Sequence, residues 1–211
     1  MKNREIISAL THLIFGFVAI FLTFISIKKG VQLKSAKHIV SYAIFGITMI
    51  SLYFASGSYH LAKKGSHKKI ILKKLDHIMI FFLIAGTYTP FCLITLQGYL
   101  GWFILSAVWI IALFGVFFKI YFIHAPRYLY TGIYLIMGWI IIFAIYPLYK
   151  NLHIYGTYLL LSGGLFYTIG AIIYAIKKPD PIPDLFGFHE IWHIFVILGT
   201  FCHFLSIYLY T

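Results

Sequence analysis

Acidic residues are scarce in this sequence, which has five Asp and Glu among 211 residues against 17 Lys and Arg. Charged residues make up 10% of the chain and apolar residues 62%, whereas a soluble domain has roughly 25% charged and about 45–50% apolar residues. This lack of charge excludes an ordinary soluble domain and indicates an integral membrane protein. The net charge of +12 does not indicate a nucleic-acid-binding protein. The lysines stand in short runs between apolar stretches, where they would meet anionic membrane lipids.

Cysteines and long polar segments are also scarce. Cys92 and Cys202 both lie in apolar stretches without C-x-x-C spacing, which excludes a disulfide framework and predicts two small buried side chains. No stretch is polar enough for a separate soluble domain, so we expect residues 1–211 to form a single transmembrane domain. The first apolar run, Ala9 to Ile27, is longer than a signal-peptide core of about 7–15 residues, and we expect it to be a retained helix.

Long apolar runs are abundant in the chain. A helix needs about 20 apolar residues to cross the hydrocarbon core of a bilayer. Seven runs of about this length are present, at 9–27, 39–62, 77–97, 101–122, 128–149, 154–176 and 188–210. The sequence therefore predicts an all-α bundle of seven transmembrane helices. The third and fourth would be joined by a very tight loop in "LQGYLG", Leu96 to Gly101.

The distribution of basic residues predicts how the bundle is oriented. If the runs alternate in direction, 12 of the 17 Lys and Arg lie on the face that holds the N-terminus, and five lie on the other face. Cytoplasmic loops carry the excess of basic residues in membrane proteins. We therefore expect a multi-pass protein of the cell membrane with a cytoplasmic N-terminus and an external C-terminus.

Few ionisable groups lie within the apolar runs, and each costs about 2.5–3.5 kcal/mol to insert, so such groups usually face the bundle interior and mark function. Ser56 and His60 stand at i, i+4 at the end of the second run, and His189 and His193 have the same spacing at the start of the seventh. Asp76 directly precedes the third run, at the end predicted to be cytoplasmic. The predicted orientation brings these three ends to the same cytoplasmic depth.

Three neutral imidazoles are suitable ligands for Zn²⁺, and a catalytic zinc site commonly has three protein ligands and one open position. His60, His189 and His193 could supply those ligands, and Asp76 could hold or deprotonate a water molecule at the open position. The alternative is that each histidine alone is an interfacial or helix-packing residue.

The stretch "GFHEIWHIF" also contains H-E-x-x-H, in which two histidines bind zinc and the glutamate acts as a base in metalloproteases. Glu190 would then be catalytic. The five letters alone do not decide between this interpretation and a site that takes its third histidine from another helix.

The remaining candidates come from the first run, the seventh run and the loops. Glu5 and His12 could support the metal site from the first helix, but a solvated helix start explains them equally well. His203 would lie about 15 Å beyond His193, too far to share a metal ion, and a hydrogen-bonding role in the core is expected. The histidines in or beside loops are expected at the surface; they are His38, His67, His124 and His153.

Six short segments of the chain form a recognisable combination. They are "EIISALTH" (Glu5 to His12), "SGSYH" (Ser56 to His60), "KLDH" and "AGTYTPF" (Lys74 to Phe91), and "FGFHEIWHIF" followed by "CHF" (Phe186 to Phe204). With these segments the chain resembles the hemolysin III family of bacterial seven-helix membrane proteins. That family belongs to the superfamily of progestin and adipoQ receptors, which includes the adiponectin receptors and is related to alkaline ceramidases.

The resemblance implies a zinc ion held by His60, His189 and His193, with Asp76 touching the zinc through water and Ser56 near the metal. It also implies that Glu190 is a bystander, because the third histidine comes from the second helix. An intramembrane protease with H-E-x-x-H remains the rival interpretation.

Two classes of function follow. In the first, the protein is a zinc-dependent hydrolase in which Asp76 is the general base, Ser56 stabilises the oxyanion, and a lipid amide or ester enters from the bilayer. In the second, zinc staples three helices of a non-enzymatic membrane protein, either a receptor-like sensor or a cytolytic pore-former. The pore ranks lowest, because a compact seven-helix bundle offers no evident wide channel.

Overall fold

The computed structural model describes residues 2–122 and 126–211, and their regular structure is helical apart from one isolated bridge between Ile182 and Phe186. The α-helices are α1 (Lys2–Gln32), α2 (Ala36–Leu61), α3 (His67–Pro90), α4 (Gly98–Tyr121), α5 (Arg127–Trp139), α6 (Ile145–Asn151), α7 (Ile154–Ile176) and α8 (Phe188–Tyr210). A π-helical segment, Phe91–Leu96, continues α3, and a 3-10 segment, Ile140–Ala144, joins α5 to α6.

Seven helical stretches among the described residues are long and apolar enough to cross a membrane, which confirms the predicted fold class. The α5–α6 pair makes one crossing, Tyr128–Asn151. Two of the predicted spans, 154–176 and 188–210, coincide with α7 and α8. Two others are longer than predicted, because α1 begins at Lys2 and α3 begins at His67. Both helices continue through polar turns that lie outside their apolar runs.

The predicted tight loop between the third and fourth spans is present. Gln97 alone separates the π-helical segment from α4, with a φ of 50°, and Gly98 follows with a φ of 54°. Two successive residues in the left-handed region reverse the chain within one turn, and glycine adopts that region without steric cost.

The fifth crossing changes helix type near its middle, and one side chain satisfies the backbone groups released there. The Tyr88 hydroxyl donates to the carbonyls of Met137 at 3.0 Å and Gly138 at 2.7 Å, and it accepts the N–H of Ile141 at 2.8 Å. Unpaired backbone groups are costly within a membrane. A tyrosine on α3 therefore stabilises the irregular segment of its neighbour.

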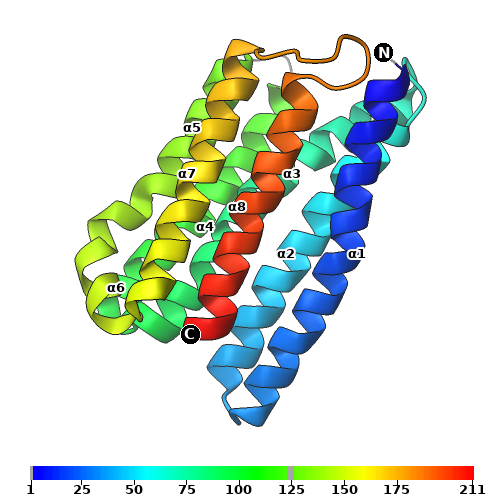
Figure 1. Cartoon of the computed structure of the whole chain (residues 1–211). Helices are drawn as coiled ribbons and strands as arrows, with labels where there is room; N and C mark the ends of the chain where they lie inside the picture. The colour runs from blue at the N-terminus through cyan, green and yellow to red at the C-terminus, as the bar shows by residue number, and fades with distance from the viewer. Residues whose placement is uncertain (1, 123–125) are drawn as a thin grey trace.

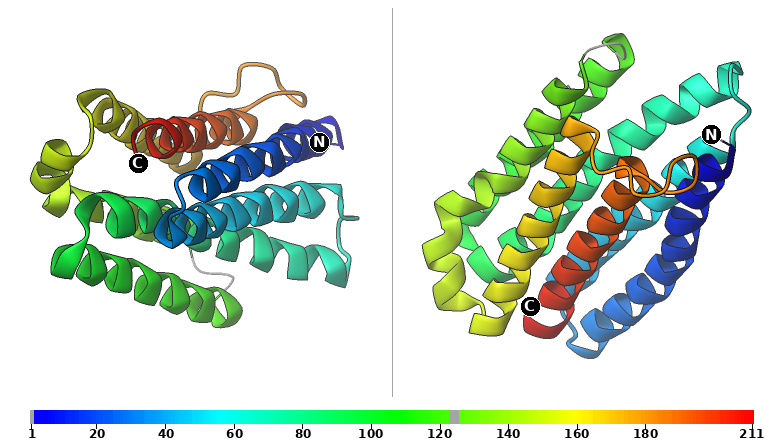
Figure 2. Two further views of the ribbon diagram at one scale, coloured as in Figure 1. Left: turned by 90° about the horizontal axis from the view of Figure 1, so that it is seen from below. Right: turned by 45° about the horizontal axis from the view of Figure 1, so that its top comes forward.

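The helices form a ring with one helix outside it (Figures 1 and 2). Neighbouring pairs in the ring are α1–α2, α2–α3, α3–α5, α5–α7, α7–α8 and α8–α1, whereas α4 packs mainly on α3. The two termini lie at opposite ends of the bundle (Figure 1). The loop at 177–187 passes across the end that holds the N-terminus, where Arg4 pairs with Asp180 at 2.8 Å.

Close packing of α1 on α2 depends on Gly57. A Cβ atom placed there would lie 2.5 Å from Cγ of Leu13, so any side chain at this position would push the two helices apart. This close approach keeps the first turns of α1 beside the last turn of α2, where His60 lies.

The cysteines and the loop histidines largely follow expectation. Cys92 is buried and Cys202 is half-buried, and both are free thiols. His67 and His153 are exposed, whereas His38 is half-buried and contacts the Ser35 hydroxyl at 2.7 Å. His124 lies outside the described residues.

Candidate metal centre and cavity

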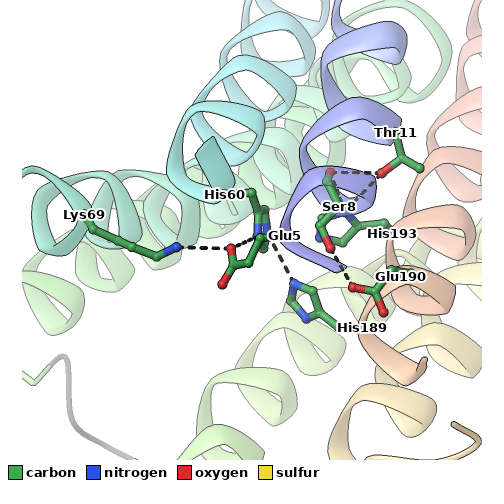
Figure 3. Close-up of polar contacts among 8 residues, drawn as sticks. All are labelled: Glu5, Ser8, Thr11, His60, Lys69, His189, Glu190 and His193. Carbon is green, nitrogen blue, oxygen red and sulfur yellow. Dashed lines mark hydrogen bonds and ion pairs between the residues drawn. The ribbon is translucent and has the colours of Figure 1, made fainter. Parts of the chain in front are cut away.

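Three histidines from two helices lie close together (Figure 3), near the end of the bundle that holds the N-terminus. His60 comes from the last turn of α2, and His189 and His193 come from the first two turns of α8. One ring nitrogen of each lies within 4.8 Å of the others, so the group could hold a metal ion. His60 and His193 are buried, and His189 is half-buried.

Glu5 on α1 fixes the orientation of His60. The His60 Nδ1 lies 3.0 Å from Glu5 Oε2, and the same oxygen accepts a hydrogen bond from Lys69 Nζ at 3.1 Å (Figure 3). A carboxylate can only accept, so Nδ1 carries the proton and Nε2 keeps its lone pair. That Nε2 lies 3.3 Å from His189 Nε2.

His193 is oriented by α1 in the same way. Its Nδ1 lies 3.2 Å from the carbonyl oxygen of Ser8 and 3.4 Å from the Thr11 hydroxyl. Because a carbonyl oxygen only accepts hydrogen bonds, Nδ1 carries the proton here too, and Nε2 is left to bind a metal ion. Hydrogen bonds of this kind set the tautomer of metal-binding histidines and raise their basicity.

Glu190 lies between the two histidines in sequence but is engaged elsewhere. The Ser8 hydroxyl donates to Oε1 at 2.7 Å, and the Gly187 N–H donates to Oε2 at 2.9 Å. The carboxylate thus caps the N-terminus of α8 and ties that helix to α1. That Glu190 takes no part in the chemistry stays a prediction.

A cavity of about 440 Å³ lies inside the ring of helices, and His189 and His193 are part of its wall. The cavity extends from His189 to His203, which is 14 positions beyond His189 on α8 and therefore about 21 Å from it along the helix axis. Small-molecule sites have volumes of about 300–1,000 Å³. Most of the wall is apolar; examples are Leu52, Leu83, Phe91, Leu135, Leu160 and Val196.

Asp76 and Ser56 line the same cavity, and both are buried. The Ser56 hydroxyl interacts with the Asp76 carboxyl group. Asp76 does not belong to the group of ring nitrogens within 4.8 Å of one another. The structure therefore brings all five residues predicted for the site to one end of the bundle, and the contact of Asp76 with a metal through water stays a prediction.

Glu5 and His12 both contact residues of the metal centre, although the Glu5 side chain is 44% exposed. Glu5 contacts His60, and His12 is 3% exposed and stacks on His193 with ring centroids 3.6 Å apart. His203 is buried, and its Nδ1 donates to the Gly199 carbonyl at 2.7 Å, as expected for a core residue.

Sequence reasoning missed three polar residues around the site. Lys69 and Thr11 contact Glu5 and His193, and nothing in their spacing distinguishes them from ordinary surface residues. Lys119 is fully buried, with Nζ 2.9 Å from the centroid of the Tyr130 ring. A lone lysine at the end of a long apolar run was the available signal, because such a charge needs a partner within the bundle.

Comparison with known proteins extends these observations along the whole chain. Residues 1–204 match the family model described as "Haemolysin-III related". Hemolysin-3 of Bacillus cereus is 40% identical over 208 residues, which cover 99% of this chain and 92% of that protein. The Hemolysin-3 homolog of Bacillus subtilis is 42% identical over 210 residues, which cover 99% of this chain and 94% of that protein.

A more distant similarity extends beyond bacteria. The adiponectin receptor protein of Drosophila melanogaster is 25% identical over 221 aligned positions, which cover 92% of this chain and 48% of that protein. These matches, together with the seven helical stretches of the described residues that are long and apolar enough to cross a membrane, indicate a multi-pass membrane protein. The chain belongs to the hemolysin III family.

Proposed function

We propose that this protein is a zinc-dependent hydrolase that cleaves an amide or ester bond in a membrane lipid. The observation that carries the proposal is a single one. Two of the clustered histidines, a buried carboxyl group and a buried hydroxyl group line one largely apolar cavity inside a membrane-spanning bundle. Metal ligands, a candidate base and space for an aliphatic chain therefore share one cavity.

The donor set fits zinc. Imidazole nitrogens bind Zn²⁺ at about 2.0–2.1 Å, and two of them in a tetrahedral site lie about 3.3–3.4 Å apart. The 3.3 Å separation of the Nε2 atoms of His60 and His189 agrees with that spacing. The hydrogen bonds to Glu5 and Ser8 leave His60 and His193 as neutral ligands with Nε2 available. His60, His189 and His193 would hold the ion.

Zinc bound there would polarise a substrate carbonyl and activate water. The chain's own side chains would do the rest. Asp76 would accept a proton during the attack of water on the carbonyl carbon. The Ser56 hydroxyl would donate a hydrogen bond to the oxygen on which negative charge develops. The apolar wall would hold the acyl chain and keep bulk water from the reacting bond.

The second candidate is a lipid-binding sensor in which zinc has a structural role. It is favoured by the origin of the ligands, because one metal ion would join α2 to α8 while α1 supports both through Glu5 and Ser8. The two candidates share the metal and the cavity, and they differ in whether Asp76 supports turnover.

Lipid hydrolysis by wild-type protein and the Asp76→Asn variant distinguishes these candidates. Zinc-loaded protein in nanodiscs would be incubated with ceramides, acyl amides and phospholipids, and released fatty acid would be measured by mass spectrometry. We expect the wild type to release fatty acid. The rate of release should be about 10²–10⁴-fold lower in Asp76→Asn, as for removal of a general base. Zinc content should stay the same. No release by the wild type from any lipid of the panel would favour the sensor.

A further inference from the structure

His12 is a buried histidine of the cavity wall that the metal centre does not use. It lies on α1 one turn beyond Ser8, and its side chain is 3% exposed. It lines the cavity together with His193, Ser56 and Asp76. It does not belong to the group of ring nitrogens that could hold a metal ion.

Two aromatic contacts hold the His12 ring in place. The ring is stacked on His193, with centroids 3.6 Å apart and planes inclined by 11°. Tyr53 contacts it edge to face, with centroids 5.1 Å apart and planes inclined by 89°. Packing on both sides limits rotation of the imidazole, so its two nitrogens point in fixed directions.

Neither ring nitrogen of His12 has a hydrogen-bond partner of good geometry among the described residues, and the His193 backbone that lies near the ring does not supply one. The other buried histidines of this region differ, because His60, His193 and His203 each have a partner at Nδ1. A buried polar group without a partner costs about 1–3 kcal/mol, and the large majority of such groups are paired in folded proteins. A ring held rigidly with both nitrogens unsatisfied, in the wall of a cavity, is suited to bind a molecule inside that cavity.

The chemistry of imidazole restricts what that molecule can be. A neutral imidazole presents one donor and one acceptor in either tautomer. A hydroxyl group both donates and accepts, so it can pair with either nitrogen and two hydroxyl groups can satisfy both, whereas a carboxylate or phosphate only accepts and can never pair with the acceptor nitrogen. A site with unsatisfied polar groups rejects ligands that cannot pair them more strongly than it discriminates by size. The apolar remainder of the cavity requires an aliphatic chain on the same molecule.

We propose that His12 binds a neutral hydroxyl group of a lipid in the cavity, and that it thereby selects hydroxylated lipids over their capped or acidic counterparts. This specificity deepens the proposed function by naming a polar group of the substrate, and it rests on that function only in treating the cavity as a lipid site. It requires no bond cleavage, so a sensor would show the same selectivity.

Binding of lipids without a hydrolysable bond tests the proposal. The probes are hexadecylglycerol, its dimethyl ether and hexadecanoate, each added to purified zinc-loaded protein, with bound lipid measured by native mass spectrometry. We expect the wild type to bind hexadecylglycerol about three- to tenfold more tightly than the dimethyl ether, as for one or two net hydrogen bonds. His12→Phe keeps the ring stacking and should bind hexadecylglycerol and its dimethyl ether equally well. His12→Asn keeps a donor and an acceptor and should retain part of the preference.

Two further measurements make the result unambiguous. Zinc content should be unchanged in both His12 variants, and a loss of zinc would assign His12 to the metal centre and overturn the proposal. His153→Phe makes the same substitution at an exposed position outside the cavity and should leave the preference intact. Equal binding of the two ethers by the wild type, an unchanged preference in His12→Phe, or a preference for hexadecanoate would each contradict the proposal. Because none of the probes can be hydrolysed, the result does not depend on whether the protein is an enzyme.

Discussion

The Nε2 atom of His60 lies 3.3 Å from the Nε2 atom of His189, although 129 positions separate the two residues in the chain. One is on α2 and the other is on α8, and a hydrogen bond to Glu5 leaves the His60 nitrogen with its lone pair on the side of His189. One metal ion can bind both nitrogens at this separation. The metal centre and the packing of three helices are therefore coupled.

Replacement of a clustered histidine by alanine should release the metal. We expect wild-type protein to bind about one zinc per chain, and His60→Ala, His189→Ala and His193→Ala each to lose most of it, because two remaining imidazoles form a much weaker site. Zinc per chain, measured by inductively coupled plasma mass spectrometry after purification, checks this.

Glu190→Gln is the matched control for these variants. The amide oxygen can still accept from the Gly187 N–H and the amide NH2 group can donate to the Ser8 hydroxyl oxygen, so zinc should remain bound. Full zinc retention by His60→Ala together with loss of an activity in Glu190→Gln would instead support an intramembrane protease.

Glu5 should influence zinc affinity without binding the metal. Glu5→Gln removes the negative charge that pairs with the His60 Nδ1–H and with Lys69. Supporting groups of this kind typically change metal affinity about 10–100-fold. Competition with a zinc chelator should show a loss of that size, whereas Lys68→Gln, an exposed neighbour of Lys69, should show none. An unchanged affinity in Glu5→Gln would mean that His60 is oriented by packing alone.

Much of the fold could be predicted from apolar run length, because a bilayer requires a certain number of apolar residues per crossing. The α7 and α8 helices begin and end at the predicted residues. The i, i+4 spacing of His189 and His193 correctly placed both side chains on one face of α8. The tight turn at Gln97 was also predictable, because a glycine and a polar residue interrupt the apolar run there.

Hydropathy did not predict the extent of α1. Charged residues lower the hydropathy of a segment even when they lie on a helix and are paired. Arg4 binds Asp180 and Glu5 binds His60 across the bundle, so the first turns of α1 are helical although they are polar. The position of His12 was equally hard to predict, since a histidine in the first turn of the predicted run 9–27 is compatible with contact with solvent. Only the packing of α1 against α8 shows that this ring stacks on His193.

Tyr88 should contribute to stability through the backbone groups of the fifth crossing. Tyr88→Phe would leave the Ile141 N–H and the Gly138 carbonyl without their hydroxyl partner. Loss of a buried partner costs about 1–3 kcal/mol, and we expect a lower midpoint of thermal unfolding in detergent with zinc content unchanged. Tyr146→Phe, at a position that is 66% exposed, should leave the midpoint unchanged. Equal midpoints for the two variants would show that the irregular segment does not need Tyr88.

Membrane orientation is a prediction from charge that labelling can check. With most basic residues on the face of the N-terminus, the metal centre would lie near the cytoplasmic side. An impermeant thiol reagent added to intact cells should label a cysteine tag after Thr211 and miss one before Met1. The parent chain for this experiment should lack Cys92 and Cys202. Labelling of the N-terminal tag alone would reverse the assignment.

The most direct test of the central claim is a crystal structure of zinc-loaded protein with anomalous data collected at the zinc edge. The central claim is an open zinc site held by three histidines beside a carboxyl group that remains free to act as a base. We predict one anomalous peak bound by the Nε2 atoms of His60, His189 and His193, with a water molecule between the ion and the Asp76 carboxylate. Direct binding of the ion by Asp76 with no water present, or a peak located away from these histidines, would contradict the claim.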